Sequence, residues 1–228
     1  MGKLNSGKEL LELHEKLTRE TDKKKPVVVV CGGTACTALG CQKVVSALKD
    51  EVQKYDGRID MRITGCQGFC EKGPIVILTP QNIFYSHVKE EDIPEIIEKT
   101  VLKGETIERL LYKDPAEKSY ANMFEIPFYA KQKRLLLDQH ILVDAYSIED
   151  YILNGGYQAL YKVLSEMKPD QVIDEVEKAN LRGRGGGGFP AARKWRTCAK
   201  AHPGKKHYLL CNGDEGDPGA YMDRSIME

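Results

Sequence analysis

Two pairs of cysteines, each placed at the end of a predicted strand, most constrain what this chain can fold into. The pairs have the spacings C-x4-C and C-x3-C and consist of Cys31, Cys36, Cys66 and Cys70. Residues 27–30 are consecutive valines, which predict a strand buried on both faces just before the first pair. Apolar and polar residues alternate over 59–63, which predicts a half-buried strand before the second pair. The sequence therefore places thiols at two strand ends.

Four thiols delivered by two loops meet the requirement of a [2Fe-2S] cluster, in which each iron takes two protein sulfurs. Zinc sites also use paired cysteines, with about two to four residues between paired ligands, so the spacing permits zinc without being its commonest form. A third interpretation is buried thiols that bind no metal, because buried cysteine is often inert. The favoured prediction is an iron–sulfur cluster. Cys41 is not needed as a ligand and is predicted to be structural.

The composition excludes several classes of protein. The chain has 228 residues with 34 basic and 34 acidic side chains, so its overall charge does not indicate nucleic-acid binding. The apolar runs are too short to cross a bilayer and the first residues show no export signal, which predicts a soluble cytoplasmic protein without membrane insertion. An odd number of cysteines, 7, then favours reduced thiols that bind a metal over a disulfide scaffold.

The first half of the chain predicts an α/β domain over residues 26–104, after an N-terminal helix within residues 1–25. Leu10, Leu13 and Leu17 recur at helical spacing in that first segment. In the domain, the patterns predict strand, helix, strand, strand, strand and helix, with a hairpin around Pro80 and a last helix that ends at Gly104. This order is typical of a mixed sheet with helices packed on it.

Residues 105–127 mix Lys, Asp, Pro and Asn without periodicity and are predicted to be an interdomain linker. A second domain is predicted over residues 128–228. Its predicted helices lie near 148–153, 160–167 and 172–180. Residues 207–211 predict a buried strand, and Cys198 and Cys211 are predicted to be buried thiols.

A glycine-rich loop follows the last of these helices. Gly183, Gly185 and Gly188 satisfy G-x-G-x-x-G, but the dinucleotide fingerprint requires a preceding strand, and the preceding pattern here is helical. The loop also lacks the G-K-[ST] ending of a P-loop. Its backbone N–H groups can converge on a phosphate, helped by Arg182, Arg184 and Lys194. A flexible linker is the alternative interpretation of the loop.

The first half contains VCGGTACTALGC and TGCQGFCEKGPIV, which resemble the thioredoxin-like [2Fe-2S] ferredoxins found beside, or fused to, the flavoproteins of respiratory complex I and its relatives. This resemblance extends over about residues 26–103. It implies that the cluster ligands are Cys31, Cys36, Cys66 and Cys70.

The second half contains LRGRGGGGFPAARKW and CNGDEGDPGAYMDRSIME, which resemble the start of the NADH-binding flavoprotein subunit of complex I and its relatives. The fold class expected is therefore α/β, a thioredoxin-like [2Fe-2S] domain followed by the beginning of an FMN-binding α/β domain. The resemblance implies flavin contacts at Gly183, Arg184, Gly185, Gly186, Lys194, Asn212, Asp214 and Glu215. It also implies NADH contacts at Phe189 and Asp217, although Asp217 stands where the family often has Glu.

By the same resemblance, the chain is a subunit of a multi-subunit NADH:acceptor oxidoreductase, with FMN and a [2Fe-2S] cluster as cofactors and NAD(H) as substrate. Fusion of the two domains resembles soluble complexes of hydrogenase, formate dehydrogenase or benzoyl-CoA reductase type. No acid or base catalyst is expected for hydride transfer. Because the family's flavoprotein domain continues further, the 228 residues are expected to be incomplete, with a [4Fe-4S] cluster in the missing part. The alternative function is a non-catalytic [2Fe-2S] carrier or docking module.

Overall fold

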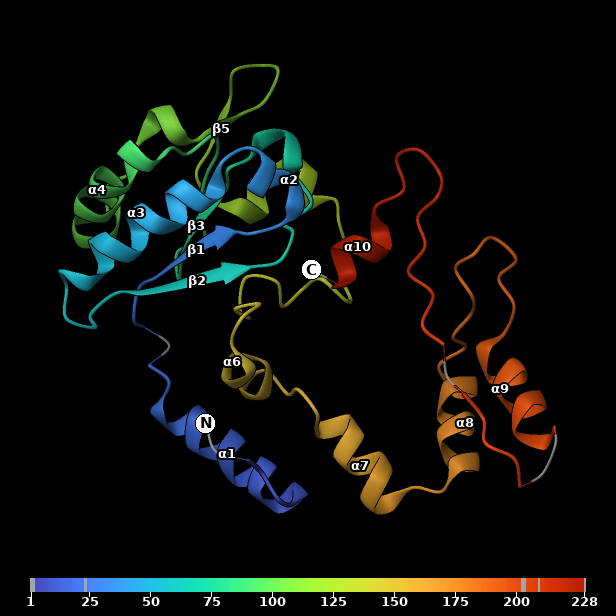
Figure 1. Ribbon diagram of the computed structural model, residues 1–228. Coiled ribbons are helices and arrows are strands. Elements are labelled where there is room, and N and C mark those ends of the chain that lie inside the picture. Colours follow the sequence, from blue (N-terminus) through green and yellow to red (C-terminus); the bar gives the residue numbers. More distant parts are fainter. Residues whose placement is uncertain (1–2, 23, 202–203, 209, 228) are drawn as a thin grey trace. The chain divides into compact units, whose positions relative to one another are not determined.

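The computed structural model describes residues 3–22, 24–201, 204–208 and 210–227 (Figure 1). The contacts divide the chain into two compact units, which are described separately. One unit comprises Met1–Leu11 and Gly155–Gly213, and the other comprises Glu12–Asn154 and Asp214–Glu228. The second of these, called the sheet unit below, contains the cysteine pairs.

The sheet unit is built on a mixed sheet of four strands in the order β2-β1-β3-β4. These strands are β1 (Val27–Cys31), β2 (Asp60–Thr64), β3 (Val76–Thr79) and β4 (Ile83–Tyr85). Strand β1 pairs in parallel with β2 and antiparallel with β3, so it has a neighbour on each side. Its valines at 28, 29 and 30 are fully buried, which confirms the prediction of a strand covered on both faces.

Helix α3 (Cys41–Gln53) covers the sheet of this unit. It contacts β1, β2 and α4 (Ile93–Glu95), and it buries Val44 and Leu48, one helical turn apart. Helix α4 continues into a π-helix, Ile96–Leu102, so the predicted last helix is present. The backbone leaves this helix at Gly104, as predicted, with a φ of 73°. The remaining helices of this unit are α1 (Gly7–Glu20, which begins in the other unit), α2 (Thr34–Ala38), α5 (Pro127–Ala130), α6 (Ile148–Leu153) and α10 (Met222–Met227).

The segment predicted to be a linker, residues 105–127, is part of the sheet unit, so that prediction is wrong. Ile107, Met123 and Ile126 are buried in the same core as the sheet. Backbone N–H groups of β4 and of the residue after it donate to this segment, from Phe84 to the Ala121 carbonyl (2.8 Å) and from Ser86 to the Leu110 carbonyl (2.9 Å). The segment covers the edge of β4, whose backbone groups would otherwise lack partners. It also forms the small hairpin β5 (Tyr112–Lys113) and β6 (Ser119–Tyr120).

The division between the units also differs from the predicted domain boundary at residue 128. Residues 128–154 cluster with the sheet unit rather than with the segment that follows. Phe128, for example, stacks on Phe69 with ring centroids 4.3 Å apart and planes inclined by 12°. The aromatic residues that close this core are far apart in the sequence, so hydrophobic periodicity gives no sign of their contact.

The other unit contains helices α7 (Gln158–Glu166), α8 (Pro169–Lys178) and α9 (Ala191–Lys200). The first two confirm the helices predicted there. Helices α8 and α9 pack together, and Arg196 links them through contacts with Asp174 (3.0 Å) and Glu177 (2.6 Å). The glycine-rich loop connects these two helices, so the unit places that loop at the start of α9.

Two predictions for this region are wrong. The described residues among 207–211 form no strand, and Tyr208 and Leu210 are 72% and 86% exposed, because no described strand lies beside them to pair with their backbone. Cys198 and Cys211 are exposed rather than buried. Cys198 lies on a different face of α9 from Ala192 and Arg196, which face α8.

Among the described residues, no helix combines the length and the apolar character needed to cross a bilayer.

Candidate functional site

The topology of the sheet brings the two cysteine pairs to one edge. Cys31 is the last residue of β1, and it lies opposite Thr64, the last residue of β2. Because β1 and β2 are parallel, the loops that leave them start side by side. Cys36 follows in the short helix α2, and the chain after β2 carries Cys66 and then Cys70, which begins a 3-10 turn, Cys70–Lys72. The strand pairing, rather than sequence proximity, therefore assembles the four thiols.

The four sulfur atoms form one connected group. The Cys31 thiol is in hydrogen-bonding contact with both Cys36 and Cys66, and the Cys66 and Cys70 sulfurs are 3.7 Å apart. All four are free thiols; Cys70 is partly exposed and the others are buried. Among the described residues, no group of three or more His, Cys, Asp or Glu side chains is arranged to hold a single metal ion. The thiol contacts therefore run in a chain from Cys36 through Cys31 and Cys66 to Cys70.

Burial and mutual contact raise the pKa values of three of these thiols, those of Cys31, Cys66 and Cys70. The hydrogen bond to Cys36, together with burial, raises the pKa of Cys31 to about 12. The hydrogen bond to Cys31 and then burial raise the pKa of Cys66, and burial raises that of Cys70. Metal ligation requires thiolates, so a metal or cluster that binds here must displace protons.

Backbone N–H groups near the sulfurs compensate for part of this cost. The Gly68 N–H donates to the Cys66 sulfur (3.4 Å), and the backbone of Gln67 donates to Cys31. Hydrogen bonds of this kind favour the negatively charged form of sulfur. Gly73 allows another close approach, because a β-carbon there would lie 2.9 Å from the Cys36 sulfur. The backbone of these loops therefore approaches the sulfur atoms closely.

Cys41 lies outside this connected group. It begins helix α3, it is buried, and its described partner is the Thr37 hydroxyl, with oxygen and sulfur 3.7 Å apart. Its surroundings agree with the prediction of a structural residue.

A segment that the sequence did not mark as functional covers the loop between Cys66 and Gly68. Arg134 donates to the Gln67 carbonyl (3.0 Å), and His140 Nδ1 donates to the Cys66 carbonyl (2.9 Å). The Gln67 side-chain amide in turn donates to the His140 carbonyl (3.2 Å). Nothing in the periodicity of residues 128–154 predicts these contacts, because they depend on the backbone of the loop and not on matching side chains.

Two side-chain polar atoms in or near this loop, Gln67 Oε1 and the Tyr129 hydroxyl, are buried and have no hydrogen-bond partner among the residues that the structure describes. Buried polar atoms in native proteins are usually hydrogen-bonded, to protein, water or a bound group. The donor set of four thiols, the nearby backbone N–H groups and an unpartnered hydroxyl together fit a group rich in negatively charged sulfur. On this ground the residues fit the [2Fe-2S] cluster that the sequence predicts.

The glycine-rich loop is closed at its base and open at its tip. Arg182 and Pro190 form an isolated antiparallel bridge, and the Gly183 N–H donates to the Phe189 carbonyl (2.9 Å). At the tip, Gly186 has a φ of 101°, a backbone conformation that side-chain-bearing residues rarely adopt. A β-carbon on Gly185 or Gly186 would meet no atom within 4 Å. The loop therefore presents accessible backbone at the start of α9.

Two other expected contacts of this unit, Phe189 and Lys194, line one hollow at α9. Phe189, Lys194, Thr197, Cys198 and Ala201 line a hollow of about 520 Å³. Phe189 is 51% exposed, which argues against its being an ordinary core residue, and the Arg193 guanidinium lies 5.8 Å from its ring centre. Lys194 and Phe189, which were predicted to contact different ligands, therefore line the same hollow. The guanidinium of Arg184 donates instead to the Arg182 carbonyl (3.0 Å), within the loop itself.

The acidic turn is divided between the two units. Asn212 belongs to the unit that contains the glycine-rich loop, whereas Asp214, Glu215 and Asp217 belong to the sheet unit. The Glu215 carboxylate accepts hydrogen bonds from the backbone of Asp223 (2.7 Å) and Arg224 (3.3 Å), at the start of α10. In this structure, Glu215 therefore caps a helix.

Alanine substitutions at two neighbouring glycines distinguish the effect of backbone conformation in the loop from the effect of available space. Gly186→Ala forces a β-carbon onto a residue with φ of 101°, whereas at Gly187 the φ is not in that range and nothing lies within 4 Å. Such strain costs about 1–3 kcal/mol. If this loop binds the phosphate of FMN, we expect Gly186→Ala to weaken FMN binding by roughly tenfold or more, measured by flavin fluorescence titration of the natural protein. The matched variant Gly187→Ala is expected to change the affinity little; equal effects of the two variants would contradict a requirement for this conformation.

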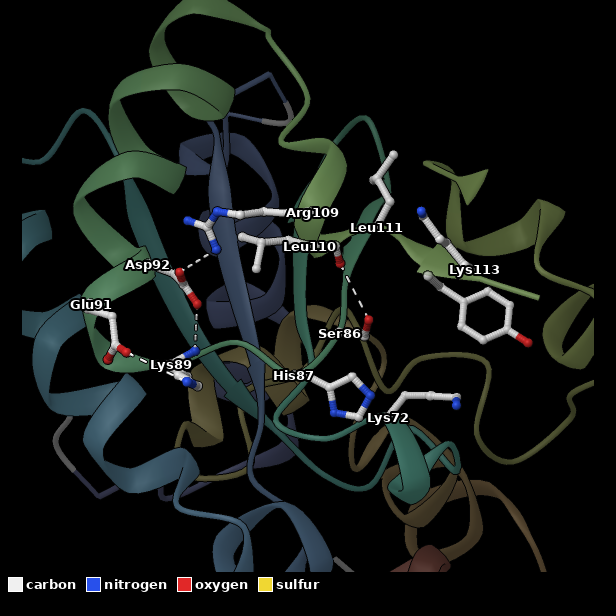
Figure 2. A pocket seen from close by; sticks show the side chains of 11 residues that line it. Lys72, Ser86, His87, Lys89, Glu91, Asp92, Arg109, Leu110, Leu111 and Lys113 are labelled. Atoms are coloured by element: carbon white, nitrogen blue, oxygen red, sulfur yellow. Dashed lines mark hydrogen bonds and ion pairs between the residues drawn. The ribbon is translucent and has the colours of Figure 1, made fainter. Parts of the chain in front are cut away.

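A cavity of about 630 Å³ lies elsewhere in the sheet unit (Figure 2). Its walls include Lys72, which follows the cysteine loop, and His87, Lys89 and Arg109. Figure 2 shows Arg109 directed at Asp92, with a contact of 2.6 Å. Lys89 lies 3.9 Å from Glu91. Because Arg109 and Lys89 already face carboxylates, the cavity is not a preformed anion site, and we assign it no ligand.

Family models match two parts of the chain. Residues 15–101 match the thioredoxin-like [2Fe-2S] ferredoxin, and residues 176–228 match the Nuo51 FMN-binding domain. The first match contains all four clustered cysteines, and the second contains the glycine-rich loop and the acidic turn.

Several known proteins are similar to parts of this chain. A subunit of the NADH-quinone oxidoreductase of Rhizobium meliloti is 51% identical over 37% of this chain and 20% of its own length. The HndC subunit of the NADP-reducing hydrogenase of Solidesulfovibrio fructosivorans is 45% identical over 43% of this chain and 19% of its own length. The chain therefore spans about a fifth of these relatives. Among solved structures, the thioredoxin-like [2Fe-2S] ferredoxin of Aquifex aeolicus is 30% identical over 40% of this chain and 99% of its own, with a TM-score of 0.36.

Proposed function

We propose that the protein is an electron-transfer subunit of an NAD(H)-dependent oxidoreductase complex, because residues 15–101 match the thioredoxin-like [2Fe-2S] ferredoxins and residues 176–228 match the Nuo51 FMN-binding domain. The observation that carries this proposal is the group of four linked thiols at the ends of β1 and β2, on the same chain as a glycine-rich loop with exposed backbone. The relatives named above are subunits of an NADH-quinone oxidoreductase and of an NADP-reducing hydrogenase.

In this proposal, the reaction converts NADH into NAD⁺, a proton and two electrons, or runs in reverse. FMN supplies the exchange between a hydride and single electrons, and an iron–sulfur cluster accepts one electron at a time. Cys31, Cys36, Cys66 and Cys70 hold the cluster as thiolates, and the Gly68 N–H stabilises the negative charge on the Cys66 sulfur. The short helix α2 and the turn after Phe69 fix the direction of the ligands.

The residues of the other site act by binding and orientation. The backbone of Gly183, Gly185 and Gly186, with Arg184 and Lys194, binds the FMN phosphate at the start of α9, where partial positive charge also favours an anion. Polar oxygens of Asn212, Asp214 and Glu215 accept hydrogen bonds from the flavin, which requires Glu215 to exchange its contacts with α10 for flavin contacts. Phe189 provides an exposed aromatic face for the nicotinamide nucleotide, with Asp217 as a second contact.

We further propose a cytoplasmic protein that passes electrons to other subunits, of hydrogenase, formate dehydrogenase or benzoyl-CoA reductase type. The support is the presence of both sequence families on one chain and the similarity to a hydrogenase subunit. Isolation of the natural complex and identification of its subunits would distinguish these types of partner.

The proposed function is tested by adding NADH to the natural protein after anaerobic purification. Loss of flavin absorbance, followed by the electron paramagnetic resonance (EPR) signal of a reduced [2Fe-2S] cluster, is expected. A protein that contains the cluster but binds no FMN, and whose cluster NADH does not reduce, would instead be a carrier or docking module.

A further inference from the structure

The Tyr129 side chain is buried beside the cysteine group with no partner for its hydroxyl. Tyr129 lies in α5 and is 5% exposed, and its hydroxyl has no hydrogen-bond partner among the described residues. An unpaired buried hydroxyl is energetically costly, so a native protein rarely leaves one without a ligand or water. The hydroxyl therefore has a proton available for an acceptor.

Aromatic contacts fix the direction of the Tyr129 ring. Its centroid is 5.9 Å from that of Phe69, at an interplanar angle of 87°, and 5.7 Å from that of Phe84. Phe128 also packs edge-on, with centroids 5.0 Å apart. Edge-to-face contacts of this kind restrict the ring. Phe69 directly precedes Cys70, so the aromatic group connects Tyr129 to the cysteine loop.

The titratable groups that interact with Tyr129 are Arg134 and three thiols of the cysteine group. Cys31, Cys66 and Cys36 all interact electrostatically with Tyr129. A tyrosine phenol carries its proton at neutral pH, so the buried hydroxyl is able to donate a hydrogen bond. Arg134 lies 4.9 Å from the ring centre and also donates to the Gln67 carbonyl (3.0 Å), which holds Tyr129 and the cluster loop together.

We propose that the Tyr129 hydroxyl donates a hydrogen bond to a sulfur atom of the [2Fe-2S] cluster and thereby raises its reduction potential. This inference rests on the cluster assignment in the proposed function. A bound cluster would supply inorganic sulfide beside the four ligand sulfurs, and both kinds of sulfur would accept hydrogen bonds. Reduction adds negative charge to the sulfurs, so a donated hydrogen bond stabilises the reduced form more than the oxidised form. Tyr129 is therefore a positioning residue that sets the electron affinity of the cluster.

The test is a potentiometric EPR titration of the natural protein and its Tyr129→Phe variant. We expect the variant to be reduced about tenfold less favourably, which corresponds to a potential lower by about 59 mV for one electron. The matched control is Tyr112→Phe. Tyr112 also packs on Phe69, at 5.3 Å, but its described contacts are with aromatic rings and Lys72 rather than with the thiols. The cluster of the Tyr112→Phe variant is expected to have the same reduction potential as that of the wild type.

The iron and sulfide content of the wild-type protein and the variants is measured in the same experiment. It distinguishes absence of the cluster from an intact cluster with an unchanged potential. A wild-type protein without the cluster would overturn the proposed function and this inference together. An intact cluster whose potential is the same in Tyr129→Phe would overturn this inference alone, and would indicate that the hydroxyl pairs with Gln67 Oε1 through water. Loss of the cluster from a Tyr129→Phe variant with an unchanged circular dichroism spectrum would support the contact, whereas loss of both would overturn it.

Discussion

Cys31→Ala is expected to abolish the [2Fe-2S] cluster, whereas Cys41→Ala is expected to retain it. Both residues are buried to the same degree, at 2% exposure, so the two variants lose similar packing. They differ in contacts, because Cys31 joins Cys36 to Cys66 and Cys41 touches the Thr37 hydroxyl. Without Cys31, one iron loses one of its two protein sulfurs.

Iron and sulfide content, with the visible absorption spectrum, measure this difference. Cys31→Ala should lose essentially all of the cluster absorbance, and Cys41→Ala should keep nearly all of it. Loss of the cluster from Cys41→Ala alone would show that the ligands are not the connected group of thiols. Equal loss from both variants would indicate a general packing defect.

Met123→Ala is expected to destabilise the sheet unit by about 2–5 kcal/mol, the usual cost of removing a large buried side chain. Met123 is 1% exposed and lies in the same core as the sheet, and its N–H donates to the Asn82 carbonyl (2.9 Å). A residue of a solvated interdomain linker would lose less than about 0.5 kcal/mol on the same substitution. The variant therefore tests whether residues 105–127 belong to the folded unit.

The neighbouring residue provides the control for this prediction. Phe124 is 54% exposed, so Phe124→Ala should change the free energy of unfolding much less than Met123→Ala. Chemical denaturation of the intact chain, followed by circular dichroism, measures both values. Similar small effects at the two positions would favour the linker interpretation again.

The sequence predicts the sheet well because its strands follow from local patterns. The valines of β1 lie in its buried centre, and strand ends place Cys31 and Cys66 on neighbouring loops. The structure of residues 105–127 was not predicted because the segment is held by backbone hydrogen bonds to β4 and its neighbour and by a few scattered apolar residues, which produce no periodicity. Tyr129 was missed for a related reason, since its importance depends on distant contacts with Phe69 and Phe84.

The predicted strand at 207–211 shows the opposite error. The apolar residues there suit a strand, but a strand also needs a neighbour for its backbone, and the described residues provide none. In the same way, the acidic residues of the turn suggest ligand contacts, while the structure engages Glu215 at the start of α10. Residue type predicts what a segment is able to bind, and the fold decides which partner it has.

Metal and sulfide analysis of the anaerobically purified protein tests the central claim most directly. Four thiols joined through Cys31 and Cys66 should hold a diiron centre, which predicts about two iron and two acid-labile sulfide ions per chain, with an EPR signal on one-electron reduction. A colourless protein with one zinc ion and no sulfide, or one in which these cysteines form disulfides, would contradict the account.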